Sequence, residues 1–211
     1  MAYKLIVFDF DGTLANSFPW VLGILDELAK KFNTKPLDPT QLEQIKNYSP
    51  RVILEMHNVP LWKLPSILKF TRARMRTHGE TIKIFEGVDL LLQALSERNI
   101  RLAIVTTNTR ETVRRVLGEE LFELFHYLED RVSIFGKPAA LRKIIRKSGY
   151  EKVEMLSIGD EIRDLEAAQI VHIPFGAVSW GFSSLEALSQ RFPSHTFTNM
   201  QQILEVVDAF A

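Results

Sequence analysis

Carboxylate side chains occur in two closely spaced pairs in this sequence of 211 residues. Asp9 and Asp11 are two residues apart and follow an apolar run, and Asp160 and Asp164 are four residues apart after another. A carboxylate can attack an electrophile, transfer a proton or bind a cation, and its neighbours decide which of these it does. If the fold brings the two pairs together, they form one reactive centre in which these roles are divided.

The elements that would position these residues are short, almost continuously apolar runs. Such runs are typical of strands that are buried on both faces of a parallel sheet. Helical patterns separate them, one over residues 108–125 with Asn108 as its capping residue, and another over residues 137–149 with Pro138 at its start. This alternation predicts an α/β fold, a Rossmann-like three-layer α/β/α core with a parallel sheet. The predicted strands lie within residues 4–10, 100–107, 131–136, 153–160 and 173–180.

Residues 17–82 interrupt this alternation, because they contain only helical patterns between the first two predicted strands. A connection between neighbouring parallel strands needs about a dozen residues, so this interval is too long for a simple connection. We therefore predict an inserted α-helical cap at residues 17–82 and a core formed by residues 1–16 and 83–211. The helical patterns of the cap lie within residues 18–32, 39–47, 49–59 and 64–79.

Polar residues follow the predicted strands at their carboxyl ends, which share one edge in a parallel sheet. Two carboxylates about 4 Å apart repel each other by roughly 4 kcal/mol at an effective dielectric constant near 20, so a pocket with several of them needs a cation. All-oxygen ligands favour Mg²⁺, and the sequence has no cysteine and no spaced histidine pair for zinc. The residues expected at this edge are Asp9, Asp11, Thr106, Thr107, Asn108, Lys137, Asp160 and Asp164.

A Mg²⁺ ion in such a pocket usually binds alongside a phosphate group. Lys137 and Thr106, together with the backbone N–H groups of Thr107 and Asn108, are suitable donors to phosphate oxygens. We prefer the hydroxyl of Thr106 to that of Thr107. A lysine at a helix start also indicates a bound anion, because its charge opposes the helix dipole.

Asp9 and Asp11 differ in what their positions allow. A carboxylate beside a cation can attack phosphorus and form an aspartyl-phosphate, because the metal offsets the repulsion between two anions. A second carboxyl group near the first can protonate the leaving alkoxide and later deprotonate the attacking water. We therefore assign Asp9 as the nucleophile and Asp11 as the general acid and base.

The composition argues against several other classes. The 26 Lys and Arg residues balance the 26 Asp and Glu residues, which gives no overall field for binding nucleic acid or an acidic membrane. The absence of cysteine excludes a disulfide framework and a cysteine nucleophile. No apolar run approaches the length of a membrane span, and no secretory signal pattern is present. We expect a cytoplasmic protein without a nucleic-acid or membrane partner.

Other conspicuous residues carry weaker predictions. Phe18, Trp20 and Trp62 are expected to form the core of the cap, and one of them or Arg51 could reach a bound substrate if the cap closes over the site. The histidines have no metal-ligand spacing and receive no role; they are His57, His78, His126, His172 and His195.

The polar residues resemble the motifs of the haloacid dehalogenase-like superfamily of phosphatases. Its motifs are matched, in order, by residues 9–13, Thr106, Lys137 with Pro138, and residues 159–164. The inserted helices are similar to the small α-helical cap of that family. Residues 178–188, followed by a short strand predicted at residues 195–199, resemble the phosphoglycolate-phosphatase-like branch.

The resemblance implies that Asp9, the backbone carbonyl of Asp11 and Asp160 hold Mg²⁺, with Asp164 in support. It also implies a phosphatase that acts on a small phosphorylated metabolite, as a monomer or homodimer. The cap segment 47–65 lacks the glycine-containing loop of true phosphoglycolate phosphatases, so the resemblance implies the chemistry rather than the substrate. A phosphomutase and a non-enzymatic phospho-accepting or binding protein remain the alternatives.

Overall fold

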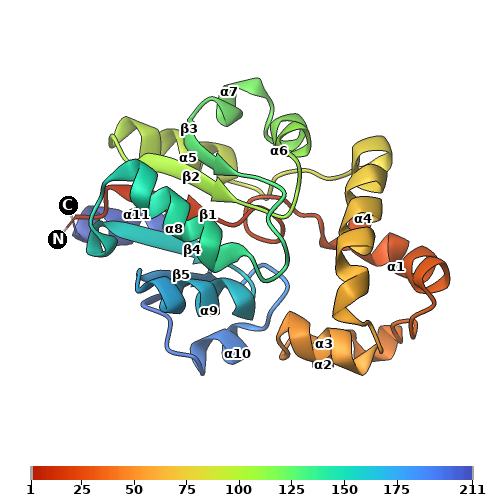
Figure 1. Ribbon diagram of the computed structural model, residues 1–211. Coiled ribbons are helices and arrows are strands. Elements are labelled where there is room, and N and C mark those ends of the chain that lie inside the picture. The colour runs from red at the N-terminus through yellow and green to blue at the C-terminus, as the bar shows by residue number, and fades with distance from the viewer. Residues whose placement is uncertain (1, 211) are drawn as a thin grey trace.

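The sheet of this protein is parallel throughout. A computed structural model describes residues 2–210, so positions 1 and 211 of the predicted core lie outside the described residues. Within residues 2–210, six strands form one sheet in the order β3-β2-β1-β4-β5-β6 (Figure 1). They are β1 (Leu5–Phe8), β2 (Arg101–Val105), β3 (Phe125–Glu129), β4 (Met155–Gly159), β5 (Phe175–Val178) and β6 (His195–Phe197). The predicted α/β class is confirmed, as is the short strand at the end of the chain.

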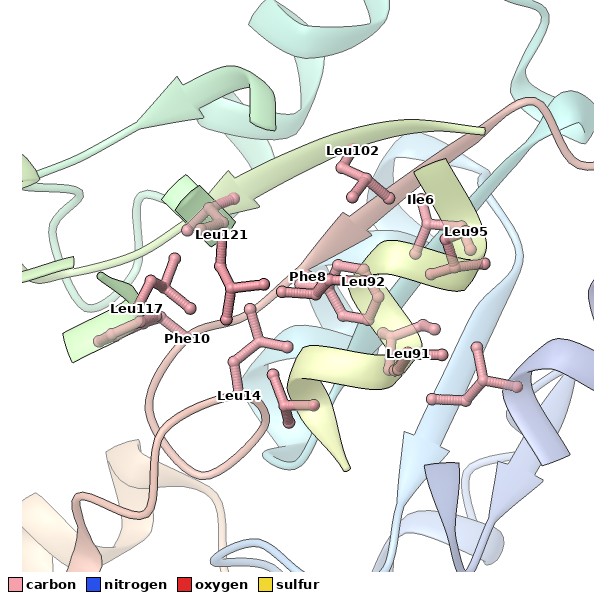
Figure 2. Packing of buried hydrophobic residues seen from close by; sticks show 14 of the residues in the cluster. Ile6, Phe8, Phe10, Leu14, Leu91, Leu92, Leu95, Leu102, Leu117 and Leu121 are labelled. Carbon is pink, nitrogen blue, oxygen red and sulfur yellow. The ribbon is translucent and has the colours of Figure 1, made fainter. Parts of the chain in front are cut away.

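Helices cover both faces of the sheet, because successive side chains of a strand point to opposite faces. Leu5 and Val7 of β1 pack against α8, α9 and α10, whereas Ile6 and Phe8 pack on the opposite face with α5, α6, α7 and α11. Figure 2 shows this second cluster, in which Leu92 of α5 lies beside Phe8. The helices of the two outer layers are α5 (Val88–Glu97), α6 (Arg110–Leu117), α7 (Glu119–Phe122), α8 (Lys137–Ser148), α9 (Ile162–Val171), α10 (Leu185–Ser189) and α11 (Met200–Ala209).

The helices between β1 and α5 stand apart from the sheet (Figure 1). They are α1 (Phe18–Phe32), α2 (Leu42–Ile45), α3 (Pro50–Met56) and α4 (Leu64–His78), with 3-10 turns at Pro39–Gln41 and Leu61–Lys63. We call them the cap helices. Trp62 is 76% exposed, so its predicted place in the core of the cap is wrong. Along residues 2–210, no helix combines the length and the apolar character needed to cross a bilayer.

The chain leaves the sheet for the cap helices and returns from them at adjacent points. The backbone N–H of Asn16 donates to the carbonyl of Lys83 over 2.8 Å, and that of Phe85 donates to the carbonyl of Leu14 over 2.9 Å. These hydrogen bonds lie at the predicted limits of the cap. The two connecting segments are therefore tied to each other, while the treatment of residues 17–82 as a separate domain stays a prediction.

The prediction of a strand at residues 131–136 is wrong. Those residues form a turn, and the third strand is β3, which ends before them. β3 lies at the edge of the sheet and is partly exposed, so its sequence lacks a continuous apolar run. The backbone N–H of Val132 donates to the carbonyl of Thr106 over 3.0 Å and ties the turn to the sheet edge. Lys137 follows this turn and begins α8, as the sequence predicts.

The helix predicted at residues 108–125 is also divided. Its capping residue is Thr109 and not Asn108, because the hydroxyl of Thr109 accepts from the backbone N–H of Thr112. Gly118, with a φ of 77°, then separates α6 from α7, and Phe125 already belongs to β3. By contrast, α8 has the predicted bounds, since Gly149 adopts the left-handed conformation after its last residue.

Candidate active site

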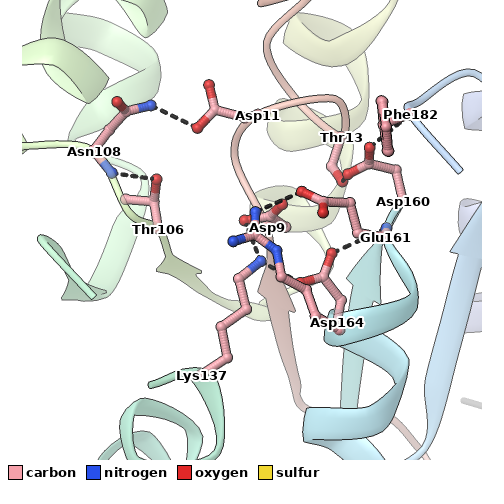
Figure 3. A network of polar contacts seen from close by, with 11 residues as sticks. Asp9, Asp11, Thr13, Thr106, Asn108, Lys137, Asp160, Glu161, Asp164 and Phe182 are labelled. Carbon is pink, nitrogen blue, oxygen red and sulfur yellow. Dashed lines mark hydrogen bonds and ion pairs between the residues drawn. The ribbon is translucent and has the colours of Figure 1, made fainter. Parts of the chain in front are cut away.

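The strand order of the sheet places the candidate site between β1 and β4. These two strands pair directly, and the chain order runs outward from them on both sides. A reversal of this kind opens a crevice at the carboxyl ends of the strands. Asp9 follows β1 and Asp160 follows β4, so both carboxylates lie at this crevice (Figure 3).

Asp9 is buried and paired with Lys137. Its Oδ1 lies 2.7 Å from Lys137 Nζ, and the same ammonium group contacts Oδ1 of Asp164. Asp164 is held in turn by the backbone N–H of Glu161, which donates to its Oδ2 over 3.1 Å. Within the described part of the chain, the buried Oδ2 of Asp9 has no hydrogen-bond partner. That oxygen is free to bind a ligand.

Asp160 is fixed by two donors and closely flanked by two glycines. Thr13 Oγ1 donates to Oδ1 over 2.9 Å, and the backbone N–H of Phe182 donates to Oδ2 over 2.7 Å. A Cβ atom on either Gly12 or Gly181 would stand 2.1 Å from an atom of the Asp160 side chain. Gly12 also has a φ of +76°, which other residues rarely adopt. The glycines therefore leave this carboxylate the space that it occupies.

Asp11 faces away from Asp9, toward the loop that follows β2 (Figure 3). Its Oδ2 accepts from Asn108 Nδ2 over 2.7 Å, while its buried Oδ1 finds no partner among residues 2–210. Burial raises the pKa of Asp11, although the hydrogen bond from Asn108 opposes this effect. A raised pKa suits a group that has to donate a proton.

The residues that follow β2 make different contacts. The hydroxyl of Thr106 is fully buried and accepts from the backbone N–H of Asn108 over 3.0 Å, so its own proton is available to another group. The backbone N–H of Asn108, which the sequence predicts to bind phosphate, is thus already engaged with Thr106. The carbonyl of Thr107 accepts from Arg72 Nε on α4 over 2.6 Å, which places Thr107 in contact with the cap helices.

The acidic cluster carries an unfavourable excess of negative charge. Burial raises the pKa of Asp9 to about 7, and the positive charge of Lys137 lowers it only in part. Burial, together with the charges of Glu161 and Asp9, raises the pKa of Asp160 well above its ordinary value. For Lys137, burial lowers the pKa, but the carboxylates of Asp164 and Asp9 outweigh it and the net pKa is raised. Lys137 alone does not balance the three carboxylates.

Asp9, Asp160 and Asp164 could together hold a cation. Each offers one carboxylate oxygen, and these atoms lie within 4.8 Å of one another. Hard divalent cations such as Mg²⁺ prefer oxygen ligands of this kind, and the free Oδ2 of Asp9 is open to coordination. The residues fit such an ion. Asp164, which is expected only to support the ligands, lies within this group. The backbone carbonyl of Asp11 stays a predicted ligand.

Glu161 and Arg163 form a buried ion pair for which the sequence alone suggests no role. Arg163 Nη2 contacts Glu161 Oε1, and the two side chains are only 15% and 14% exposed. Burial lowers the pKa of Arg163, but the charges of Glu161 and Asp164 outweigh it, so the guanidinium stays charged. The single basic residue, Arg163, among the acidic residues at positions 160, 161 and 164 is the one signal in the sequence that could have indicated this pair.

A cavity of about 260 Å³, which we call the site cavity, opens beside the candidate catalytic groups. Asp11 and Asp160 line it from the sheet edge, with Glu161 and Arg163 nearby. Phe18 of α1 and several apolar residues of the cap helices form the opposite wall. The cavity therefore has one charged wall and one apolar wall.

The chain is similar to known proteins along nearly its whole length. The family model described as haloacid dehalogenase-like hydrolase matches residues 6–178. A phosphoglycolate phosphatase of Synechococcus elongatus is 30% identical over 205 residues, which are 97% of each chain. The pyrophosphatase PpaX of Oceanobacillus iheyensis is 25% identical over 219 residues, with 100% of both chains covered.

The fold is also shared with solved structures. A haloacid dehalogenase-like family hydrolase from Streptococcus pneumoniae superposes with a TM-score of 0.78 at 18% sequence identity, over 97% of this chain and 98% of that one. The segment that matches the family model contains the cap helices and every candidate residue from Asp9 to Asp164. The chain therefore belongs to the haloacid dehalogenase-like hydrolase family.

Proposed function

We propose that the chain is a Mg²⁺-dependent phosphatase that hydrolyses a small phosphomonoester through an aspartyl-phosphate intermediate. The observation that carries the proposal is the position of Asp9, which lies beside Lys137, keeps one buried oxygen free and shares an acidic cluster with Asp160. Asp11 lies two residues further on and lines the site cavity. The proposed nucleophile, cation site and proton donor are thus separate groups at the same edge of the sheet.

The assignment of the chain to an enzyme class does not depend on this detailed mechanism. The chain is a phosphoglycolate-phosphatase-like member of its family and a hydrolase acting on phosphoric monoesters, in agreement with the family model and the full-length relatives. Those relatives are named for two different compounds, phosphoglycolate and pyrophosphate. Both compounds contain a phosphoryl group, but the part bonded to that group differs between them.

In the proposed first step, one carboxylate oxygen of Asp9 attacks the phosphorus atom of the monoester. A bond forms between that oxygen and phosphorus, and the ester P–O bond breaks. The leaving oxygen takes the proton of Asp11, whose raised pKa keeps that proton available. This step yields an alcohol, a phosphorylated Asp9 and an ionised Asp11.

In the second step, water attacks the phosphorus atom of the phosphorylated Asp9. The Asp11 carboxylate accepts a proton from that water, and the bond between phosphorus and the Asp9 oxygen breaks. Inorganic phosphate leaves, and both carboxyl groups return to their starting state. The hydrogen bond from Asn108 holds Asp11 in one orientation through both steps.

A bound Mg²⁺ would supply the positive charge that offsets the repulsion between Asp9 and the phosphate. Asp9, Asp160 and Asp164 would hold it through carboxylate oxygens, with the backbone carbonyl of Asp11 as a further ligand. Thr13 and the N–H of Phe182 keep Asp160 in place for this purpose.

The phosphate oxygens would be bound by donors that the structure leaves available. Lys137 already lies beside the nucleophile, and the hydroxyl proton of Thr106 is not used in the contact with Asn108. The backbone N–H of Thr107 completes the proposed set, since that of Asn108 is engaged with Thr106.

Release of phosphate from p-nitrophenyl phosphate tests the proposal. We expect activity that requires Mg²⁺, disappears with EDTA and falls by on the order of 10⁴-fold or more in Asp9→Asn. Asp26→Asn, at an exposed position of α1, is the matched control and should retain full activity. Full activity of Asp9→Asn would refute the mechanism. Faster transfer to an added sugar phosphate than to water would favour the phosphomutase alternative.

A further inference from the structure

A second cavity lies among the cap helices and is larger than the site cavity. It has a volume of about 280 Å³ and is lined by residues of α1, α2, α3, α4 and the loops between them; we call it the cap cavity. Its walls are almost wholly apolar, with leucines at positions 22, 25 and 28 among them. An apolar cavity of this kind excludes water and favours an apolar ligand.

The cap cavity adjoins the site cavity. The side chains that line both are Phe18, Val21, Ile53, Leu54 and Phe182. The rings of Phe18 and Phe182 meet edge to face with their centroids 5.3 Å apart, which joins α1 to the loop after β5. A ligand that extends from the sheet edge toward the cap therefore meets an apolar wall, which Val21, Ile53 and Leu54 help to form.

The position of the proposed proton donor indicates which part of a substrate would lie against this apolar wall. Asp11 lines the site cavity, and in the proposed reaction it touches the leaving oxygen. The organic part of the substrate is bonded to that oxygen and must extend away from Asp9. Phe18 and Val21 of α1 line the same cavity, so the leaving group lies against them and points toward the cap cavity.

His57 provides a polar contact in the cap cavity. Its side chain is 7% exposed, and its Nδ1 lies 3.2 Å from the carbonyl oxygen of Lys35, which makes Nδ1 the protonated nitrogen. Among the described residues, its Nε2 has no hydrogen-bond partner. In the neutral ring Nε2 is therefore a buried, unused acceptor in an apolar cavity.

The charges around the cap cavity argue against an anionic group at the far end of the substrate. Within the described part of the chain, the lysine or arginine that lines the cap cavity is Lys35, which is exposed to solvent. Arg163 lines only the site cavity, where it is paired with Glu161 and its buried Nε has no hydrogen-bond partner among the described residues. A carboxylate in the cap cavity would thus be buried without a buried cation beside it, which is unfavourable.

Given the proposed function, we infer that the leaving group is apolar: the substrate class is a monophosphate ester of an extended alcohol whose far end carries a hydroxyl or another hydrogen-bond donor for His57. The phosphate binds at the sheet edge, the apolar body lies along Val21, Ile53 and Leu54, and the donor meets Nε2. This class differs from phosphoglycolate, whose leaving group is short and ionised.

Ethyl, butyl, hexyl and octyl phosphate test the chain-length part of the inference, because they share one reacting group. We expect kcat/KM to rise about fourfold per methylene until the cavity is filled. Calorimetric binding of the matching alkylphosphonates, which are not hydrolysed, should show the same trend without turnover. Equal binding of ethyl- and hexylphosphonate would overturn the inference. Binding that rises with chain length, without hydrolysis of any ester, would instead refute only the proposed function.

Ala29→Ile tests the location, because Ala29 lines the cap cavity and not the site cavity. The larger side chain occupies space that would accommodate about two methylenes, so kcat/KM for octyl phosphate should fall by about tenfold and that for ethyl phosphate should stay unchanged. Ala73→Ile, at an exposed position of the cap helix α4, is the control and should preserve the whole series. An unchanged series in Ala29→Ile would contradict the assignment.

The role of His57 is tested by the ratio of kcat/KM for ω-hydroxyhexyl phosphate to that for hexyl phosphate. In His57→Leu this ratio should fall by about tenfold relative to the unmodified protein, because a buried hydroxyl loses its acceptor. Any general loss of activity cancels in the ratio. His78→Leu, at an exposed histidine of α4, should leave the ratio unchanged. A ratio that is the same in His57→Leu would remove His57 from the proposed site.

Discussion

The carboxyl edge of the sheet and the cap hold their functional side chains in different ways. At the sheet edge, Asp160 accepts from two donors, Lys137 contacts two carboxylates and Asp11 is bound by Asn108. Asp160, Lys137 and Asn108 are buried, and Asp160 directly follows β4. Each one has a position that its neighbours determine.

The cap has little of this polar support. α1 buries Ala29, α4 buries Leu64 and Met75, and α3 has no fully buried residue among its described side chains. Contacts around the cap cavity are apolar, and apolar contacts do not prescribe direction as hydrogen bonds do. We infer that the sheet edge determines the reaction and that the cap determines which alcohol is released.

The largest effect in this comparison is expected from Asp11→Asn. Loss of the general acid should lower kcat by about 10²- to 10⁴-fold. Because Asp11 touches only the leaving oxygen in the proposed reaction, the loss should be equal for every alkyl phosphate. Steady-state kinetics over the ester series provides the measurement, with Asp26→Asn as the control. A loss that grows with chain length would show that Asp11 also contributes to selecting the alcohol.

A smaller effect is expected from the cation. Mg²⁺ at about one hundred times its dissociation constant should raise the free energy of unfolding by about 2.7 kcal/mol, if it binds only the folded chain. Asp160→Asn should remove this stabilisation, since it deletes a ligand charge and turns an amide nitrogen toward Thr13 or Phe182, both of which are donors. Urea unfolding with and without Mg²⁺ measures the difference. Glu166→Gln, at an exposed position of α9, should keep the full effect.

Arg72 connects the cap to the sheet edge, so its loss should affect both stability and substrate preference. From α4 it donates to the carbonyl of Thr107 over 2.6 Å and to that of Val132 over 3.2 Å. Arg72→Ala should lower the free energy of unfolding by about 1 kcal/mol and reduce the preference for hexyl over ethyl phosphate, because the cap loses a contact with the sheet edge. Arg76→Ala, at an exposed position of the same helix, is the comparison. An unchanged preference would mean that the cap keeps its position without Arg72.

The smallest effect is expected at Glu129, in the sheet but outside the proposed chemistry. Burial raises its pKa, but hydrogen bonds from Lys147 and Lys143 outweigh this and the net pKa is lowered. The contribution to stability is therefore present above the ordinary pKa of an unfolded glutamate and is lost as pH falls through the lowered value. Glu129→Gln should cost about 0.5 kcal/mol at neutral pH, since both lysines are half exposed, and nothing in strong acid. Urea unfolding at both pH values, with unchanged selectivity in the ester series, is the check.

Much of the sheet could be predicted from the sequence, because a strand buried on both faces needs a continuous apolar run. That pattern predicted β1, β2, β4 and β5, and the polar residues that follow β1, β2 and β4 could then be placed at the sheet edge. β3 was not predicted, because this edge strand is partly exposed and its sequence has no continuous apolar run. The turn that follows β3 contains the apolar residues Val132, Ile134 and Phe135, and its sequence therefore resembles that of a buried strand.

Features that depend on contacts distant in sequence could not be predicted. The capping role of Thr109 instead of Asn108 follows from where β2 ends, and Asn108 is then free to bind Asp11. His57 is unremarkable in the sequence, and only the packing of the cap helices around it leaves Nε2 without a partner. The identity of the cation, the cytoplasmic location and the oligomeric state stay predictions.

The hydrogen bonds that tie Asn16 to Lys83 and Leu14 to Phe85 have a consequence for how such a protein can change over time. Because the chain departs and returns at the same place, the segment between these residues can be exchanged for one of different length without altering the pairing of any strand. We expect a chimera that carries the cap of a relative to keep the sheet and its acidic cluster. A lineage could in this way inherit a new preference for alcohols in a single recombination event, with the reaction left intact.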